Sequence, residues 1–261
     1  MKKLFYLTIF ILFSCNSAQN DTPIHTETAA NHITRSGQNT TVEKHQKAWK
    51  GQLGSEINVL LHYQKYENLV VGQIIYLDTK EHKPIPIIGT VEEGENYRIL
   101  EFDHKGNITG IISGVPSAEI FKANWFSPKT GKEYSMNMSK LDSIIPEKNI
   151  EANLDKLAGE YAYQYGTAGY QGHVKVQHLE PDQITIQGYS VTSEPARNIA
   201  EMEIKASPTQ KDILHTVPEA ENCQFRIRFF KDFVYISNTK TQCTGAFGHN
   251  ATLEGIYYKT Q

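Results

Sequence analysis

Apolar and polar residues alternate along most of the chain, in short runs separated by turn-forming residues. From Trp49 to about Asp142 the runs are rich in Ile, Val and Tyr, and Gly, Asn and Asp stand between them. The clearest runs cover residues 57–61, 70–77, 85–91, 97–102 and 108–112. Period-two runs at this spacing are typical of antiparallel sheet. Roughly eight strands fit here, and closing them into a small barrel would remove the exposed edges of a single sheet.

The same alternation returns from Leu157 to the end of the sequence. Its clearest members are Val174 and Val176, Ile184 and Ile186, Phe225 with Ile227 and Phe229, and Val234 with Ile236. Both ends of this stretch carry the pattern Leu-x-Gly-x-Tyr, at 157–161 and at 253–257. We expect the first and last strands to lie side by side if the sheet closes on itself. The alternative is a coincidence in a chain with 18 Gly and 14 Tyr.

A charged segment at 143–156 separates the two stretches. It begins around Pro146, and Ile150, Leu154 and Leu157 follow at helical spacing, so the segment is either a linker or a short helix. The predicted fold is therefore mainly β. It consists of two small antiparallel β-barrels in tandem, lipocalin-like in form, at residues 46–142 and 157–261.

Residues 1–14 have the features of a secretory signal peptide. Two lysines precede an apolar run at 4–13 that is too short to span a bilayer. The sequence Leu12-Phe13-Ser14-Cys15 resembles a bacterial lipobox. The resemblance implies cleavage before Cys15, lipidation of its thiol with palmitate or a similar chain, and a lipid-anchored place in the bacterial cell envelope, at the outer membrane. The alternative is a secreted protein cleaved elsewhere, for instance after Ala18, with Cys15 discarded.

Composition predicts a tether after the leader and excludes nucleic acid as a partner. Residues 15–45 are mostly Ser, Thr, Asn, Gln and His, and such a segment cannot bury enough apolar surface to offset the entropy of ordering. We interpret it as a flexible tether. Loss of the two leader lysines takes the formal charge from −3 to −5. The sequence has no basic stripe, so we expect no binding to nucleic acid.

The chain has three cysteines, and Cys15 belongs to the lipobox. Cys223 and Cys243 remain as an even pair in an exported protein, which favours a disulfide. Closing a loop of this size would stabilise the fold by roughly 3 kcal/mol in the chain-entropy model. The alternative, two metal ligands, lacks the close cysteine pairs and histidine spacing of zinc sites.

The sequence carries no recognisable catalytic motif. It has no Gly-x-Ser-x-Gly elbow, no His-Glu-x-x-His helix and no phosphate-binding Gly-rich loop. Ser237 and Lys240 match Ser-x-x-Lys, but they end a predicted strand, whereas the catalytic motif opens a helix. Glutamates at 92, 93 and 95 lack the spaced ligands of a calcium loop, so they indicate a charged turn. We expect no enzyme activity, no cofactor and no metal site.

A cluster of aromatic residues is the remaining candidate for binding. Tyr161, Tyr163 and Tyr165 share one face of a predicted strand, and Tyr170 follows after two glycines. An exposed row of tyrosines would bind a glycan or a protein, whereas a buried row would fill the interior of a barrel. The small, Gly-rich loop at 166–172 is a second candidate, because binding residues often lie on loops.

Two further resemblances concern the exported part. The first stretch is similar to small barrel domains of uncharacterised lipoproteins from Bacteroidetes-type bacteria, through Trp49-Lys50-Gly51 and the segments 83–87 and 124–132. The segment from Cys223 to Tyr257 is similar to the C-terminal module of envelope proteins linked to lysozyme inhibition. We expect a membrane-anchored, non-catalytic module that binds a protein, glycan or small ligand. The alternatives are a lysozyme inhibitor and a hydrolase whose site is assembled from residues distant in sequence.

Overall fold

The computed structural model describes residues 46–142, 149–179, 183–207, 209–218, 220, 223–239, 243 and 245–261. These residues belong to one of the two units into which the chain divides, Glu43–Gln261. The predicted leader at 1–14, the lipidation site Cys15 and the tether at 15–45 lie outside the described residues, as does 143–148 of the predicted linker. In the described part, no helix has the length and apolar character needed to span a membrane.

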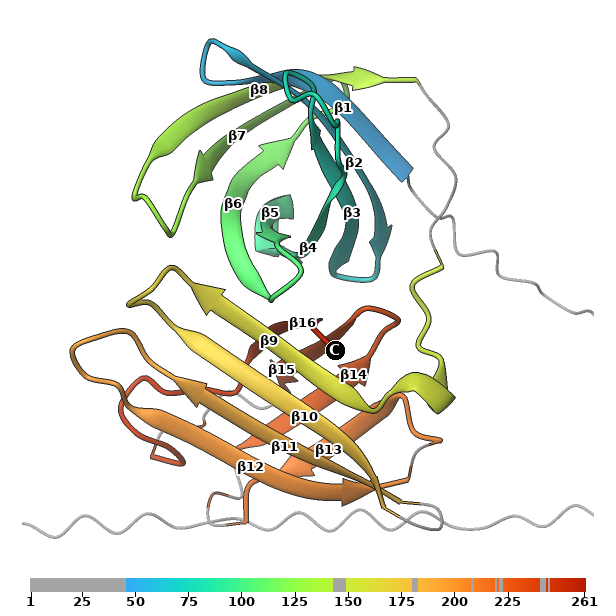
Figure 1. Ribbon diagram of the computed structural model, residues 1–261, viewed down its shortest axis with the longest axis vertical. Coiled ribbons are helices and arrows are strands. Elements are labelled where there is room, and N and C mark those ends of the chain that lie inside the picture. Colours follow the sequence, from blue (N-terminus) through green and yellow to red (C-terminus); the bar gives the residue numbers. More distant parts are fainter. Residues whose placement is uncertain are drawn as a thin grey trace, which may run out of the picture. The chain divides into compact units, whose positions relative to one another are not determined.

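The first eight strands form a closed antiparallel barrel (Figure 1). Each strand pairs with the next, and the eighth pairs back with the first through Ala48–Leu53 and Met136–Leu141. The strands are β1 (Gln46–Leu53), β2 (Ile57–Tyr66), β3 (Leu69–Tyr76), β4 (Ile85–Glu92), β5 (Asn96–Phe102), β6 (Asn107–Pro116), β7 (Ile120–Phe126) and β8 (Glu133–Leu141). The predicted barrel is therefore confirmed for this part of the chain.

Side chains fill the interior of this barrel. Trp49, Tyr63, Tyr97 and Phe121 are at most 5% exposed. Their rings contact one another, with centroids 5.6 Å apart for Trp49 and Phe121 and 5.7 Å apart for Tyr63 and Tyr97. Since successive residues of a strand point to opposite faces, one half of each period-two run supplies this core.

The second half contributes eight more antiparallel strands, in the order β12-β11-β10-β9-β16-β15-β14-β13. They are β9 (Gly159–Tyr165), β10 (Gln171–Leu179), β11 (Gln183–Val191), β12 (Ile199–Ala206), β13 (Asp212–Thr216), β14 (Gln224–Phe229), β15 (Phe233–Asn238) and β16 (Gly255–Lys259). Within the described residues β12 and β13 each pair on one side only. A second closed barrel, and a likeness to lipocalins, therefore stay predictions.

The repeated Leu-x-Gly-x-Tyr pattern has a physical explanation. The first and last strands of this half do pair, since Ala162 lies opposite Tyr258 in the β9–β16 ladder. In each copy the tyrosine hydroxyl donates a hydrogen bond to the carbonyl oxygen of the leucine four residues earlier. The O···O distance is 2.7 Å from Tyr161 to Leu157 and 2.7 Å from Tyr257 to Leu253. Each copy thus fixes the entry of its chain into the sheet.

The barrel and the second half share one hydrophobic cluster. Apolar side chains on the outer faces of β3 to β6 join the core of the second half, among them Leu69, Ile88 and Phe102. The rings of Phe102 and Tyr258 stack with centroids 5.5 Å apart. The connecting segment contains one short 3-10 helix, η2 (Leu154–Lys156), and no α-helix occurs among the residues described.

Candidate functional site

A polar pocket of about 300 Å³ lies where three turns meet, those that follow β5, β7 and β9. Figure 1 shows that these turns gather where the barrel approaches β9. A short parallel ladder between β6 and β9 joins the first and third of these turns, with Asn107 opposite Gln164 and Ile108 opposite Tyr165. The pocket is lined by Asp103, Asn107, Ile108, Thr109, Ser127, Lys129, Gln164, Gly166 and Thr167.

Asp103 organises the first of these turns. Its Oδ1 accepts hydrogen bonds from the backbone N–H of Lys105 (2.8 Å) and of Asn107 (2.9 Å), and its Oδ2 accepts one from Asn107 Nδ2 (2.7 Å). Burial acts to raise the pKa of Asp103, but these hydrogen bonds outweigh it and lower the pKa below its usual value. The pocket therefore contains one carboxylate that is ionised at neutral pH.

The second turn supplies a cation and a hydroxyl. Ser127 is 6% exposed, and its Oγ accepts a hydrogen bond of 3.4 Å from the backbone N–H of Thr130. The backbone N–H of Gly131 donates to the Ser127 carbonyl at 2.8 Å, which closes the turn. Lys129 is exposed at the tip, and no described residue forms a hydrogen bond or ion pair with its ammonium group. This ammonium group is free to meet a ligand.

The third turn belongs to the Gly-rich loop at 166–172. Gly166 has φ +61°, and a Cβ there would lie 2.5 Å from the carbonyl oxygen of Pro128, so a side chain would push the loop away from the second turn. Thr167 is exposed beside it. Gln164 donates its backbone N–H to the carbonyl of Gly106 at 3.1 Å. Its side-chain amide has no hydrogen-bond partner among the described residues.

Together these groups suit a neutral ligand that carries hydroxyl groups. Lys129, Thr167 and Gln164 offer hydrogen-bond donors, while Asp103 and the Gln164 amide oxygen offer acceptors. The one carboxylate and the one ammonium group offset each other, so the pocket favours neither anions nor cations. Apolar atoms nevertheless form more than half of the pocket surface, and Ile108 is the one aliphatic residue among those that line it. A volume near 300 Å³ is at the lower end of the range for small-molecule sites, about 300–1,000 Å³.

No family model matches the chain, and no curated protein or solved structure is detectably similar to it.

Glu101 lies beside this pocket but inside the barrel. Its carboxyl group accepts hydrogen bonds from Trp125 Nε1 (2.7 Å), from the hydroxyl of Tyr76 (2.9 Å) and, more weakly, from Thr109 Oγ1 (3.4 Å). A Cβ at Gly110 would lie 2.3 Å from Trp125 Nε1, so glycine leaves room for this cluster. Burial raises the pKa of Glu101 despite these donors. At 1% exposure the group cannot reach a ligand, and its role is structural.

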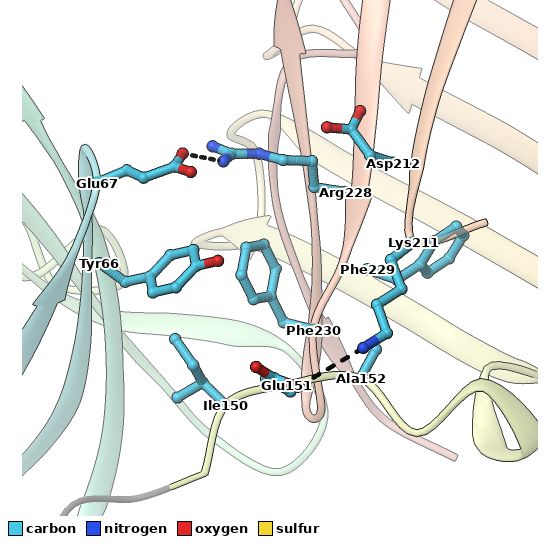
Figure 2. Close-up of a pocket in the computed structure, with 10 residues that line it drawn as sticks. All are labelled: Tyr66, Glu67, Ile150, Glu151, Ala152, Lys211, Asp212, Arg228, Phe229 and Phe230. Atoms are coloured by element: carbon cyan, nitrogen blue, oxygen red, sulfur yellow. Dashed lines mark hydrogen bonds and ion pairs between the residues drawn. The ribbon is translucent and has the colours of Figure 1, made fainter. Parts of the chain in front are cut away.

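A second cavity, of about 200 Å³, lies between the β2–β3 turn and β14, and Figure 2 shows ten residues around it. Arg228 extends to Glu67, with Nη1 2.5 Å from Oε2, and its Nη2 donates to Asn68 Oδ1 at 3.3 Å. Lys211 pairs with Glu151 at 3.6 Å (Figure 2). The cavity is small, and Arg228 and Lys211 are already paired with carboxylates. We therefore interpret the residues around it as a contact between the barrel and the second half.

The structure separates the four tyrosines proposed for binding. Tyr161 and Tyr163 are 1% and 5% exposed, so they belong to the hydrophobic core, in line with the alternative of a buried row. Tyr165 is half-buried, and Arg98 Nη2 donates to its hydroxyl at 3.3 Å. Tyr170 is 38% exposed and lies on the 166–172 loop, outside the lining of the pocket. An exposed row of four tyrosines is therefore not formed.

Apart from the loop at 166–172, the other residues singled out from the sequence lie away from the pocket or outside the described residues. Cys223 and Cys243 form a disulfide, as predicted. Cys15 and Lys240 lie outside the described residues. Among the residues described, no three His, Cys, Asp or Glu side chains gather as metal ligands would. Sequence reasoning missed Asp103, Lys129 and Gln164, whose only signal is their place at strand ends. Of the loop at 166–172, which its composition made a candidate for binding, Gly166 and Thr167 line the pocket.

Proposed function

We propose that this protein is a lipid-anchored protein of the bacterial envelope that binds a neutral, hydroxyl-rich ligand, a glycan, without transforming it. The observation that carries the proposal is the polar pocket at the three turns, with uncommitted donors on Lys129, Gln164 and Thr167. Glycans present many hydroxyl groups, each of which can donate and accept a hydrogen bond, and this pocket offers both kinds of partner. The two strand systems then act as a rigid support for the turns.

The test is a calorimetric titration of the full chain with neutral oligosaccharides of N-acetylglucosamine, glucose and mannose. We expect saturable binding of one of them, weakened at least tenfold by Lys129→Met or by Gln164→Leu. Lys132→Met is the matched control, because Lys132 is exposed on the same turn but does not line the pocket. Heat signals that all three variants retain equally would contradict the proposal.

The non-catalytic part of the proposal is tested in the same samples. We expect the oligosaccharide to be recovered intact by chromatography after prolonged incubation. Shortened products would favour the alternative of a hydrolase with an unrecognised site, provided that a single substitution in the pocket abolishes them.

Anchoring through Cys15 is proposed from the lipobox resemblance alone. Two or more acyl chains hold a protein stably at a membrane, since each buried methylene contributes about 0.8 kcal/mol. Mass spectrometry of the protein from its native host tests this. We expect an amino terminus at Cys15 carrying acyl chains, and an unmodified terminus beyond Cys15 would refute the anchor and the outer-membrane location.

Lysozyme inhibition is the second candidate. It rests on the resemblance of the segment from Cys223 to Tyr257, and the disulfide of that segment is present. The assay is the turnover of bacterial cell walls by lysozyme in the presence of an excess of the full chain. Unchanged turnover would remove this candidate and leave the glycan proposal intact.

A further inference from the structure

Two strand edges remain open in this fold. Of the sixteen strands in the described part of the chain, fourteen have a neighbour on each side, and only β12 and β13 have one. An open edge presents unpaired backbone N–H and C=O groups to another strand. In β12 the carbonyl oxygen of Ile199 already accepts a hydrogen bond from the backbone N–H of Gly248 at 3.1 Å, so the open edge of β12 begins beyond Ile199. β12 and β13 follow each other in sequence, and residues of both strands line one groove, so their open edges border the same gap.

A groove of about 510 Å³ lies at this gap. Met202 and Val217, 8% and 7% exposed, together with the half-buried Phe247, give it an apolar floor. Glu201 and Glu203, which alternate with Met202 along β12, are exposed at its rim. An apolar floor and a polar rim bordered by two open edges match the shape of an extended chain.

The charged side chains at the rim of the groove indicate the charge of the partner that would bind there. Both carboxylates at the rim are negative, and Gln187 Nε2 donates to Glu203 Oε2 at 3.2 Å, which holds that side chain in place. His215, the third titratable group of the lining, has its pKa lowered by burial and is neutral at pH 7. The groove therefore attracts a basic partner.

We propose that an extended peptide with alternating apolar and basic side chains binds between β12 and β13 as an added strand. Its backbone would pair with the open edges. Its apolar side chains would rest on Met202, Val217 and Phe247, and its basic side chains would face Glu201 and Glu203. Main-chain hydrogen bonds supply the affinity of such strand addition, and the alternate side chains supply its specificity.

The probe is a fluorescein-labelled peptide of eight residues in which valine and lysine alternate, titrated with the full chain and followed by fluorescence anisotropy. We expect saturable binding. The same peptide methylated on alternate backbone nitrogens, and a valine–glutamate peptide, should each bind at least tenfold more weakly. Equal binding of the methylated peptide would overturn the proposal, because main-chain pairing would then be irrelevant.

Charge reversal locates the peptide. The double substitution Glu201→Lys with Glu203→Lys changes only exposed side chains, and we expect it to weaken binding at least tenfold. The matched control is Glu56→Lys with Glu81→Lys, two exposed residues of the barrel for which no interaction is found among the described residues. Equal loss in both doubles would overturn the site. A dimer of the chain that dissociates when the peptide is added would also overturn the proposal, because the occupant of the gap would then be a second copy of the chain and not a separate basic peptide.

Discussion

Glu101 provides a sharp test of the barrel interior, because it is an acid without a cation beside it. The carboxyl group is 1% exposed and meets only neutral donors, from Trp125, Tyr76 and Thr109. Burial raises its pKa, so the native state binds this proton more tightly than the unfolded chain does. Glu101→Gln removes the titration while it keeps a carbonyl oxygen for the indole N–H of Trp125. The hydroxyl of Tyr76 can rotate to accept from the new amide.

The direction of the pH effect follows from this linkage. The stabilising contribution of Glu101 is complete below the pKa of the unfolded chain, near 4.5, and is lost as the pH rises through the native pKa. Between these two values the free energy of unfolding of the native sequence falls, relative to that of Glu101→Gln, by up to about 1.4 kcal/mol per pH unit. Above the native pKa the difference is constant. Other titrating groups, including Asp103 and His215, are common to both proteins and cancel in the difference.

The assay is urea denaturation followed by tryptophan fluorescence, at half-unit steps from pH 4 to pH 8, for both proteins. We expect the difference between their free energies of unfolding to change across this range in favour of Glu101→Gln. A difference independent of pH would refute the reasoning. A native protein that gains stability over the variant as the pH rises would also refute it, because Glu101 would then act as a stabilising carboxylate.

Three further changes test other parts of the fold by chemical denaturation. Tyr257→Phe should cost about 1–2 kcal/mol, because it leaves a buried carbonyl without its hydroxyl donor, and a cost near zero would contradict the role given to the repeated pattern. Replacing Cys223 and Cys243 by alanine removes a cross-link between positions 20 residues apart and should lower the free energy of unfolding by roughly 3 kcal/mol. A double variant as stable as the oxidised native protein would contradict this role of the disulfide. Glu67→Gln should cost about 1–2 kcal/mol, since the 12% exposed side chain of Arg228 loses its carboxylate partner; the exposure of Glu67 keeps this figure small, and a neutral result would count against the contact.

Local patterns predicted much of this fold. Period-two alternation identified the strands of the barrel, because each side chain's face is set by its own position in the strand. The Leu-x-Gly-x-Tyr repeat predicted that the first and last strands of the second half pair, and the hydrogen bond within each copy explains why the pattern recurs. The disulfide between Cys223 and Cys243 was predicted from the even cysteine pair together with the export that the lipobox resemblance implies.

Features that depend on distant contacts could not be predicted in this way. Alternation does not show whether a sheet closes, so it could not indicate that β12 and β13 each pair on one side only within the described residues. The outer faces of β3 to β6 are apolar because they pack on the second half, which a single strand's pattern does not reveal. The polar pocket brings together Asp103, Lys129 and Thr167 from three turns, and no motif links residues so far apart in sequence.

Nuclear magnetic resonance of the isotope-labelled full chain tests the central claim most directly, because it locates a ligand residue by residue. On addition of the oligosaccharide that binds in calorimetry, we predict shifts of backbone amide signals at 103–109, 127–131 and 164–167, the three segments around the pocket. Signals that move elsewhere while these three segments stay fixed would contradict the claim that the three turns form the binding site.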